Sequence, residues 1–74
     1  MSALTDLTTA RDVLERAQAF RTAYWMTAAG RSTHKPEERD HLVVQCFMGQ
    51  GTKTVRIDVA DAARLADVLP GGVL

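Results

Sequence analysis

Two histidines and three carboxylates share the most polar stretch of the chain, and they are the first candidates for chemistry. His34 and His41 enclose Glu37, Glu38 and Asp40. Such side chains could ligate a divalent metal or supply a general acid and base. Their spacing matches no common closed metal site, and no nucleophile or oxyanion-stabilising group accompanies them. We therefore expect no metal and no cofactor, and interpret the segment as a solvated loop whose charges largely cancel.

Cys46 and the Gly49-Gln50-Gly51 turn also lack the surroundings that catalysis needs. The single cysteine lies in an alternating pattern, which is typical of a small buried apolar residue. Its neighbours Gln45 and Phe47 offer no positive charge to stabilise a thiolate. A phosphate-binding loop ends in Lys-Ser/Thr and opens a helix, whereas these glycines precede strand residues. The sequence therefore predicts a protein that is not an enzyme.

A set of cations lies close in sequence to the only tryptophan. Arg31, Lys35 and Arg39, together with His34 and His41, could form one basic flank on the loop, close in sequence to Trp25. Cations next to an aromatic ring are the minimal equipment for binding a single-stranded nucleic acid. The three carboxylates of the same segment favour a mixed-charge contact with a protein at least as well, because alternating signs select a specific partner.

Length and charge narrow the class of partner. The 74 residues form one domain, 1–74, too short for a large core, and a lone cysteine allows no internal disulfide. We therefore expect stabilisation by a second chain, as a homodimer or a hetero-complex. Nine Lys and Arg balance nine Asp and Glu without a basic arm, which disfavours nucleic acid and anionic membranes as partners.

Composition also predicts a location. The sequence contains no run of about 18 apolar residues, which a membrane-spanning helix would need, and the N-terminus does not have the pattern of a signal peptide. A lone thiol stays reduced in the cytosol, so we expect a cytoplasmic protein. The preference for arginine over lysine, the many alanines and the lack of asparagine indicate a GC-rich bacterial or phage genome.

The elements that must position these residues predict an α+β domain in the order α-β-β-α. Residues 1–8 are expected to be frayed, and a long N-terminal helix is expected from Thr8 or Thr9 to Gly30. Its apolar face follows a helical period and comprises Ala10, Val13, Leu14, Ala17, Phe20, Tyr24 and Ala28. Trp25 and Met26 lie outside this face, which makes them interface candidates. Alternatively, Trp25 packs under the loop that follows.

The rest of the chain predicts a surface loop over 30–41, an antiparallel β-hairpin and a short C-terminal helix. Pro36 could open a short helical turn in the loop. The hairpin joins strands at 41–48 and 54–59, and the helix over 60–69 ends at Pro70. In the strand at 41–48, Val43 and Phe47 lie on the opposite face from Cys46. Two strands leave open edges and an uncovered face, so Phe47 joins the interface candidates.

This order resembles a shortened double-stranded-RNA-binding domain, which has three strands between its two helices. Here the second helix begins Ala60-Asp61-Ala62-Ala63 and lacks the paired lysines that such domains carry at that point. The resemblance therefore implies no family membership and no activity.

These observations favour a small non-enzymatic interaction or regulatory protein, such as an inhibitor, an antitoxin-like protein or an accessory factor. The expected partner is a protein, and the expected contacts are Trp25, Met26, Arg31, His34, Lys35, Arg39 and Phe47. The alternative is a nucleic-acid-binding regulator whose basic groove forms only on dimerisation.

Overall fold

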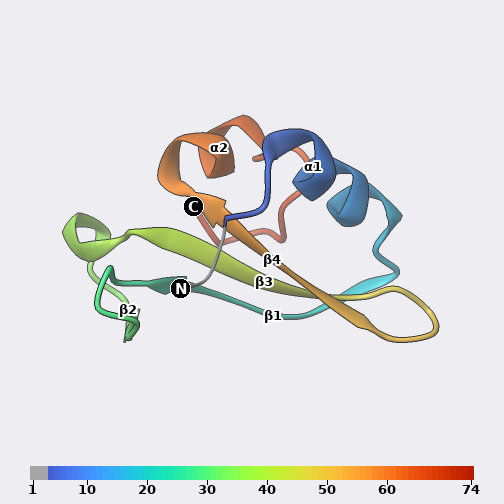
Figure 1. Cartoon of the computed structure of the whole chain (residues 1–74), viewed down its shortest axis with the longest axis horizontal. Helices are drawn as coiled ribbons and strands as arrows, with labels where there is room; N and C mark the ends of the chain where they lie inside the picture. The colour runs from blue at the N-terminus through green and yellow to red at the C-terminus, as the bar shows by residue number, and fades with distance from the viewer. Residues whose placement is uncertain (1–3) are drawn as a thin grey trace.

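The computed structural model describes residues 4–74 as one sheet with two helices on one of its faces (Figure 1). The elements are α1 (Leu7–Arg16), β1 (Ala19–Met26), β2 (Ser32–Thr33), the 3₁₀ helix η1 (Pro36–Glu38), β3 (His41–Phe47), β4 (Thr52–Asp58) and α2 (Val59–Arg64). The antiparallel strands lie in the order β2-β1-β3-β4. The predicted α+β class, the hairpin and a short C-terminal helix are confirmed. The sheet has four strands rather than the predicted two, and the helix predicted over 60–69 ends at Arg64.

The predicted long N-terminal helix is wrong, because the helix ends at Arg16 and residues 19–26 form a strand. This segment is rich in aromatic residues, which favour strands, and pairing with β3 outweighs its helical spacing. A β-bulge at Arg21 explains the misleading period. The register places Phe20 opposite the core residue Cys46 and Ala23 opposite the core residue Val44, so two residues three apart share one face.

Both ends of the supposed helix also differ from the prediction. Asp6 is the N-cap of α1, and its Oδ1 accepts from the backbone N–H of Thr9 at 2.7 Å. Thr5 donates its N–H to the carbonyl of Arg56 on β4, so residues 5–8 are not frayed, whereas residues 1–3 of that prediction lie outside the described part. Gly30, with φ of +87°, belongs to the turn between β1 and β2 rather than to a helix end.

The predicted loop over 30–41 is mostly exposed but contains β2 and η1. The turn of helix starts at Pro36, as the proline position indicated. The last residue of the predicted loop, His41, is instead the first residue of β3 and is buried.

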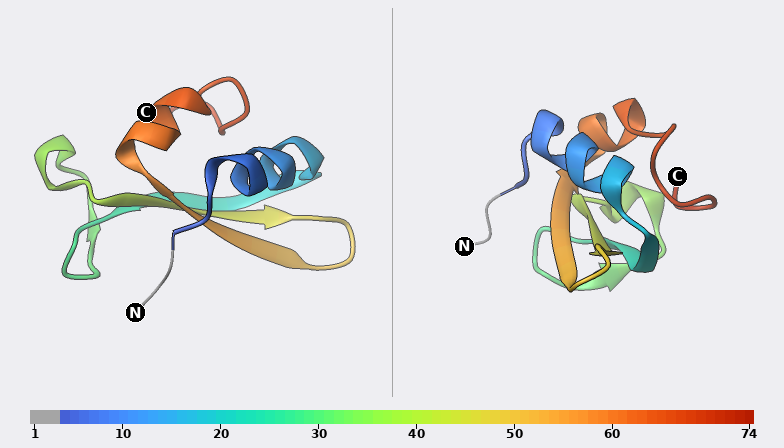
Figure 2. Two further views of the ribbon diagram at one scale, coloured as in Figure 1. Left: turned by 45° about the horizontal axis from the view of Figure 1, so that its top comes forward. Right: turned by 90° about the vertical axis from the view of Figure 1, so that its right-hand side faces the viewer.

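The core lies between the sheet and the two helices. Figure 2 shows α1 and α2 side by side above the sheet, with the C-terminal segment descending beside them. The cluster comprises Ala10, Val13, Leu14, Trp25, Leu42, Val44, Cys46, Val55, Ile57, Ala62 and Leu65. The C-terminal segment adds Val68, Leu69 and Val73, which pack against this cluster. This interior is closed by elements of the chain itself.

Candidate interaction site

Trp25 joins three parts of the chain. Its side chain lies on the core side of β1 and is only 6% exposed. The indole Nε1 donates to the carbonyl oxygen of Val73 at 2.8 Å, and the guanidinium carbon of Arg39 lies 4.7 Å from the centre of the ring. Such a cation–π contact is favourable where the pair is shielded from water. Trp25 therefore holds the C-terminal segment and the loop before β3 against β1.

An open groove of about 730 Å³ runs along β1 at this point. We call it the β1 groove. Residues 70–73 line it on one side, and residues 32–34 of β2 and its extension line it on another. The lining residues on β1 and in the loop are Phe20, Thr22, Ala23, Tyr24, Trp25 and Arg39. Phe20 and Tyr24 are exposed, at 38% and 36%.

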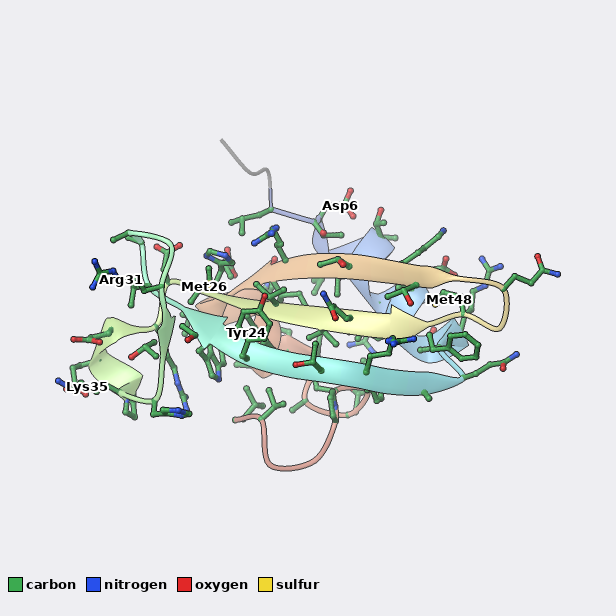
Figure 3. The ribbon with its side chains drawn as sticks, turned by 90° about the horizontal axis from the view of Figure 1, so that it is seen from below. Asp6, Tyr24, Met26, Arg31, Lys35 and Met48 are labelled. Atoms are coloured by element: carbon green, nitrogen blue, oxygen red, sulfur yellow. The ribbon has the colours of Figure 1, made fainter. Side chains whose placement is uncertain are left out.

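The floor of the β1 groove is an incomplete sheet edge. β2 pairs only with Trp25 and Met26, so among the described residues 4–74 the segment 19–24 has a strand neighbour on the β3 side alone. Thr27 donates its N–H to the carbonyl of Arg31, so the backbone groups of Thr27 point away from β3. Every second residue of a strand directs its N–H and C=O to the same side, so Trp25 and Ala23 point the same way as Thr27. Ala23 therefore presents its N–H and C=O at the open edge. Figure 3 shows β1 as the outermost long strand, with the C-terminal segment lying beyond it.

The charges that line the β1 groove have one sign. Arg39 and His34 are the ionisable residues there besides Tyr24, and no Asp or Glu of the described chain, residues 4–74, lines the groove. Glu38 and Asp40 flank Arg39 in the sequence, but each has another partner. Glu38 accepts from the hydroxyl of Thr33 at 2.9 Å, and Asp40 lies 2.9 Å from Nδ1 of His41. The Nε of Arg39 is buried and has no hydrogen-bond partner within residues 4–74. The groove is thus apolar with an electropositive point at Arg39.

In the part of the chain that the structure describes, α1 and α2 lie on one face of the sheet and the opposite face carries no helix (Figure 3). The register places Tyr24, Val43 and Arg56 in one row across this face. Val43 was expected to be partly exposed, but it is 1% exposed because its two cross-strand neighbours cover it. In the next row, the buried His41 lies with Nδ1 2.9 Å from Asp40 and Nε2 3.4 Å from Arg56. These contacts satisfy the ring nitrogens, which accounts for its burial in structural terms.

The structure separates the seven residues that the sequence singled out. Trp25, His34 and Arg39 meet at the β1 groove. Met26 and Phe47 lie half-buried at opposite ends of the helix-free face, in the rows of His41 and Ala19. Arg31 and Lys35 are exposed at the far end of the loop (Figure 3). Their roles in binding stay predictions.

Sequence reasoning missed Phe20, Ala23 and Tyr24 as site residues, because the predicted helix placed Phe20 and Tyr24 on its apolar face and gave Ala23 no role. Three aromatic residues within positions 20–25, namely Phe20, Tyr24 and Trp25, were the signal that could have revealed a strand with exposed side chains.

The resolved pKa shifts lie away from the groove. Burial raises the pKa of the Cys46 thiol. The backbone N–H of Thr9 lowers the pKa of Asp6, and a hydrogen bond from Arg11 lowers that of Asp67. Within residues 4–74, no three His, Cys, Asp or Glu side chains cluster closely enough to hold a metal ion. No helix in that range is long and apolar enough to cross a bilayer.

Comparison of the chain with models of known protein families, with curated proteins and with solved structures finds no significant match. The β1 groove and the adjacent edge of β1 are therefore the features from which a function can be inferred.

Proposed function

We propose that this chain is a small non-enzymatic interaction or regulatory protein that binds another protein through the edge of β1, in a homodimer or a hetero-complex. One observation carries the proposal, namely that residues 19–24 form an exposed strand edge next to an apolar groove. A strand added to such an edge gains main-chain hydrogen bonds, and adjacent pockets select its side chains. An inhibitor, an antitoxin-like protein or an accessory factor could use such a contact.

The closed interior changes the argument for a partner. A chain of this length was expected to need another chain to complete its core, but its buried apolar residues are covered by its own elements. The sheet edge is therefore the better reason to expect association. The bulge at Arg21 and its exposed cation limit the length of regular pairing, which is a common way to prevent open-ended association of edges.

Nucleic-acid binding gains no support from the geometry. The structure adds a third long strand and gives the order α1-β1-β3-β4-α2, yet α2 begins between Asp58 and Asp61 without a lysine. The ring of Trp25 is covered by Arg39 and buried, so it offers no face on which a base could stack.

A pair of proline variants tests the proposal. Ala23→Pro removes the outward N–H, and proline is tolerated at a strand edge where that N–H is not bonded within the sheet. The matched control is Val59→Pro, because Val59 is the exposed first residue of α2 and its extended predecessor Asp58 suits proline.

The tagged full chain is purified from its source cells, and co-purifying protein and self-association are measured by native mass spectrometry. We expect the wild type and Val59→Pro to retain a partner chain or a dimer that Ala23→Pro loses while remaining folded by circular dichroism. Equal retention by all three proteins, or the absence of any associated protein chain, would contradict the proposal.

A further inference from the structure

We infer that the β1 groove binds an extended peptide segment that carries a carboxylate, with the peptide backbone on Ala23 and the carboxylate on Arg39. This inference rests on the proposed function and names the chemistry of the partner. The two recognition elements are contributed by separate parts of the chain, β1 and the residue after η1, and both line one groove.

The backbone element sets the shape of the ligand. Ala23 offers one donor and one acceptor at the open edge, and an extended segment satisfies both at once. Side chains alternate along such a segment, so every second one turns towards the core side of β1, where Phe20 and Pro70 line the groove. A short peptide suits this edge better than the β1 strand of a second copy, because the bulge at Arg21 breaks the regular register.

The electrostatic element sets the charge of the ligand. Arg39 lines the groove, and no carboxylate lies within 4.0 Å of its side-chain nitrogens among residues 4–74. By contrast, Arg11 and Arg16 each pair with a carboxylate on the surface. The guanidinium of Arg39 is held against Trp25, so little side-chain entropy is lost when it binds a ligand. A carboxylate is the group that this planar fork recognises best.

Other occupants fit the groove less well. A nucleic-acid strand needs a row of cations that follows its phosphates, whereas the groove holds Arg39 and His34 only. A second copy of this chain would bring Arg21 of its own β1 to the edge rather than a carboxylate, because residues 19–24 contain no acid. An acidic peptide complements both the charge and the edge.

The experiment is selection of a random heptapeptide display library on the immobilised full chain. Four proteins are compared, namely the wild type, Ala23→Pro, Arg39→Gln and the control Arg64→Gln, whose arginine is exposed on α2 and does not line the groove. We expect the wild type and Arg64→Gln to enrich apolar peptides with Asp or Glu at one fixed position. Arg39→Gln should lose that position, and Ala23→Pro should enrich nothing.

Affinity then gives the magnitude. Replacing the selected Glu by Gln in a synthetic peptide removes a charge-assisted pair, so binding to the wild type should weaken about tenfold. The same replacement should change nothing for Arg39→Gln. Because Arg39 covers Trp25, Arg39→Gln must first show the tryptophan emission and the melting temperature of the wild type. If it does not, Arg39→Lys replaces it, and this variant should discriminate less between the Glu and the Gln peptide.

The outcomes separate the two proposals. Enriched peptides that depend on Ala23 but show no acidic position would overturn the inference and leave the proposed function standing. No enrichment on any protein would overturn the inference. The comparison of Ala23→Pro with Val59→Pro would then still show whether the edge of β1 binds a native partner. An Ala23-dependent dimer, or Arg39-dependent binding of a single-stranded oligonucleotide, would assign the groove to a different occupant and also overturn it.

Discussion

Gly72→Ala is the substitution that most sharply tests whether the C-terminal segment forms one side of the β1 groove. Gly72 has φ of +84°, and no atom lies within 4 Å of the position that a Cβ would take. The cost of an alanine is therefore backbone strain alone, about 1–2 kcal/mol for an L-residue in this region. Gly71→Ala is the matched control, because its site is equally open and its φ is not positive.

The strain competes with a contact of similar size. The segment is tied to the sheet by the bond from Trp25 Nε1 to the carbonyl of Val73, which contributes about 0.5–1.5 kcal/mol net. Upstream, Leu69 packs against the core and donates its N–H to the carbonyl of Leu65. We therefore expect residues 70–74 to detach locally while α2 and its extension stay in place. The loss of about 1 kcal/mol lowers the melting temperature by about 4–8 °C.

The only tryptophan reports the result. In Gly72→Ala, water reaches the indole of Trp25, so its fluorescence emission shifts to longer wavelength at a temperature where circular dichroism still shows the native fold. Gly71→Ala should keep the wild-type emission and melting temperature. If the two variants behave alike, whether unchanged or both unfolded, the docking of this segment on Trp25 is refuted.

Three further predictions concern the scaffold. Cys46 is buried and its thiol pKa is raised, so iodoacetamide should modify it at pH 8 only as fast as the protein unfolds, and rapid reaction of the native protein would contradict its burial. Asp58→Ala removes the cap that accepts from the N–H of Asp61, so the free energy of unfolding in urea should fall by about 1 kcal/mol; no change would mean that the cap is dispensable. The hydrogen bond from Arg11 lowers the pKa of Asp67 below its ordinary 3.8. The ionised Asp67 therefore stabilises the fold above pH 3.8, and this stabilisation is lost as the pH falls through the lowered pKa. Asp67→Asn should flatten the pH dependence of acid unfolding in this range, and an unaltered profile would exclude the contact.

The parts of the fold that the sequence predicted are those with an undisturbed period. Alternation from His41 to Phe47 and around Ile57 identified β3 and β4, and the switch of period after Asp58 identified α2. The error over 19–26 arose where the bulge at Arg21 changed a strand period into one that reads as helical. Local spacing cannot reveal this, because β1 is specified by its pairing with β3, which lies far along the chain.

The candidate site was predicted only in part for the same reason. Arg39 and His34 were selected for their charge, and Trp25 for its size, without any means to know that they meet. Their meeting depends on the pairing of β1 with β2, which places Thr33 opposite Trp25, and on the loop that lays Arg39 over the ring. The C-terminal segment that completes the groove returns to Trp25 from 48 residues away. The strand edge at Ala23 carries no chemical signal in its side chain, so only the topology could show it.

Amide hydrogen exchange at Ala23, followed by NMR in the full chain, tests the central claim most directly. In the free protein, we predict rapid exchange at Ala23 between two protected neighbours, because the N–H groups of Thr22 and Tyr24 face β3. Addition of a partner chain or a selected peptide should slow exchange at Ala23 and leave its neighbours unchanged. Strong protection of Ala23 in the free protein, or unaltered exchange in a bound one, would contradict the claim that this edge is open and receives a strand.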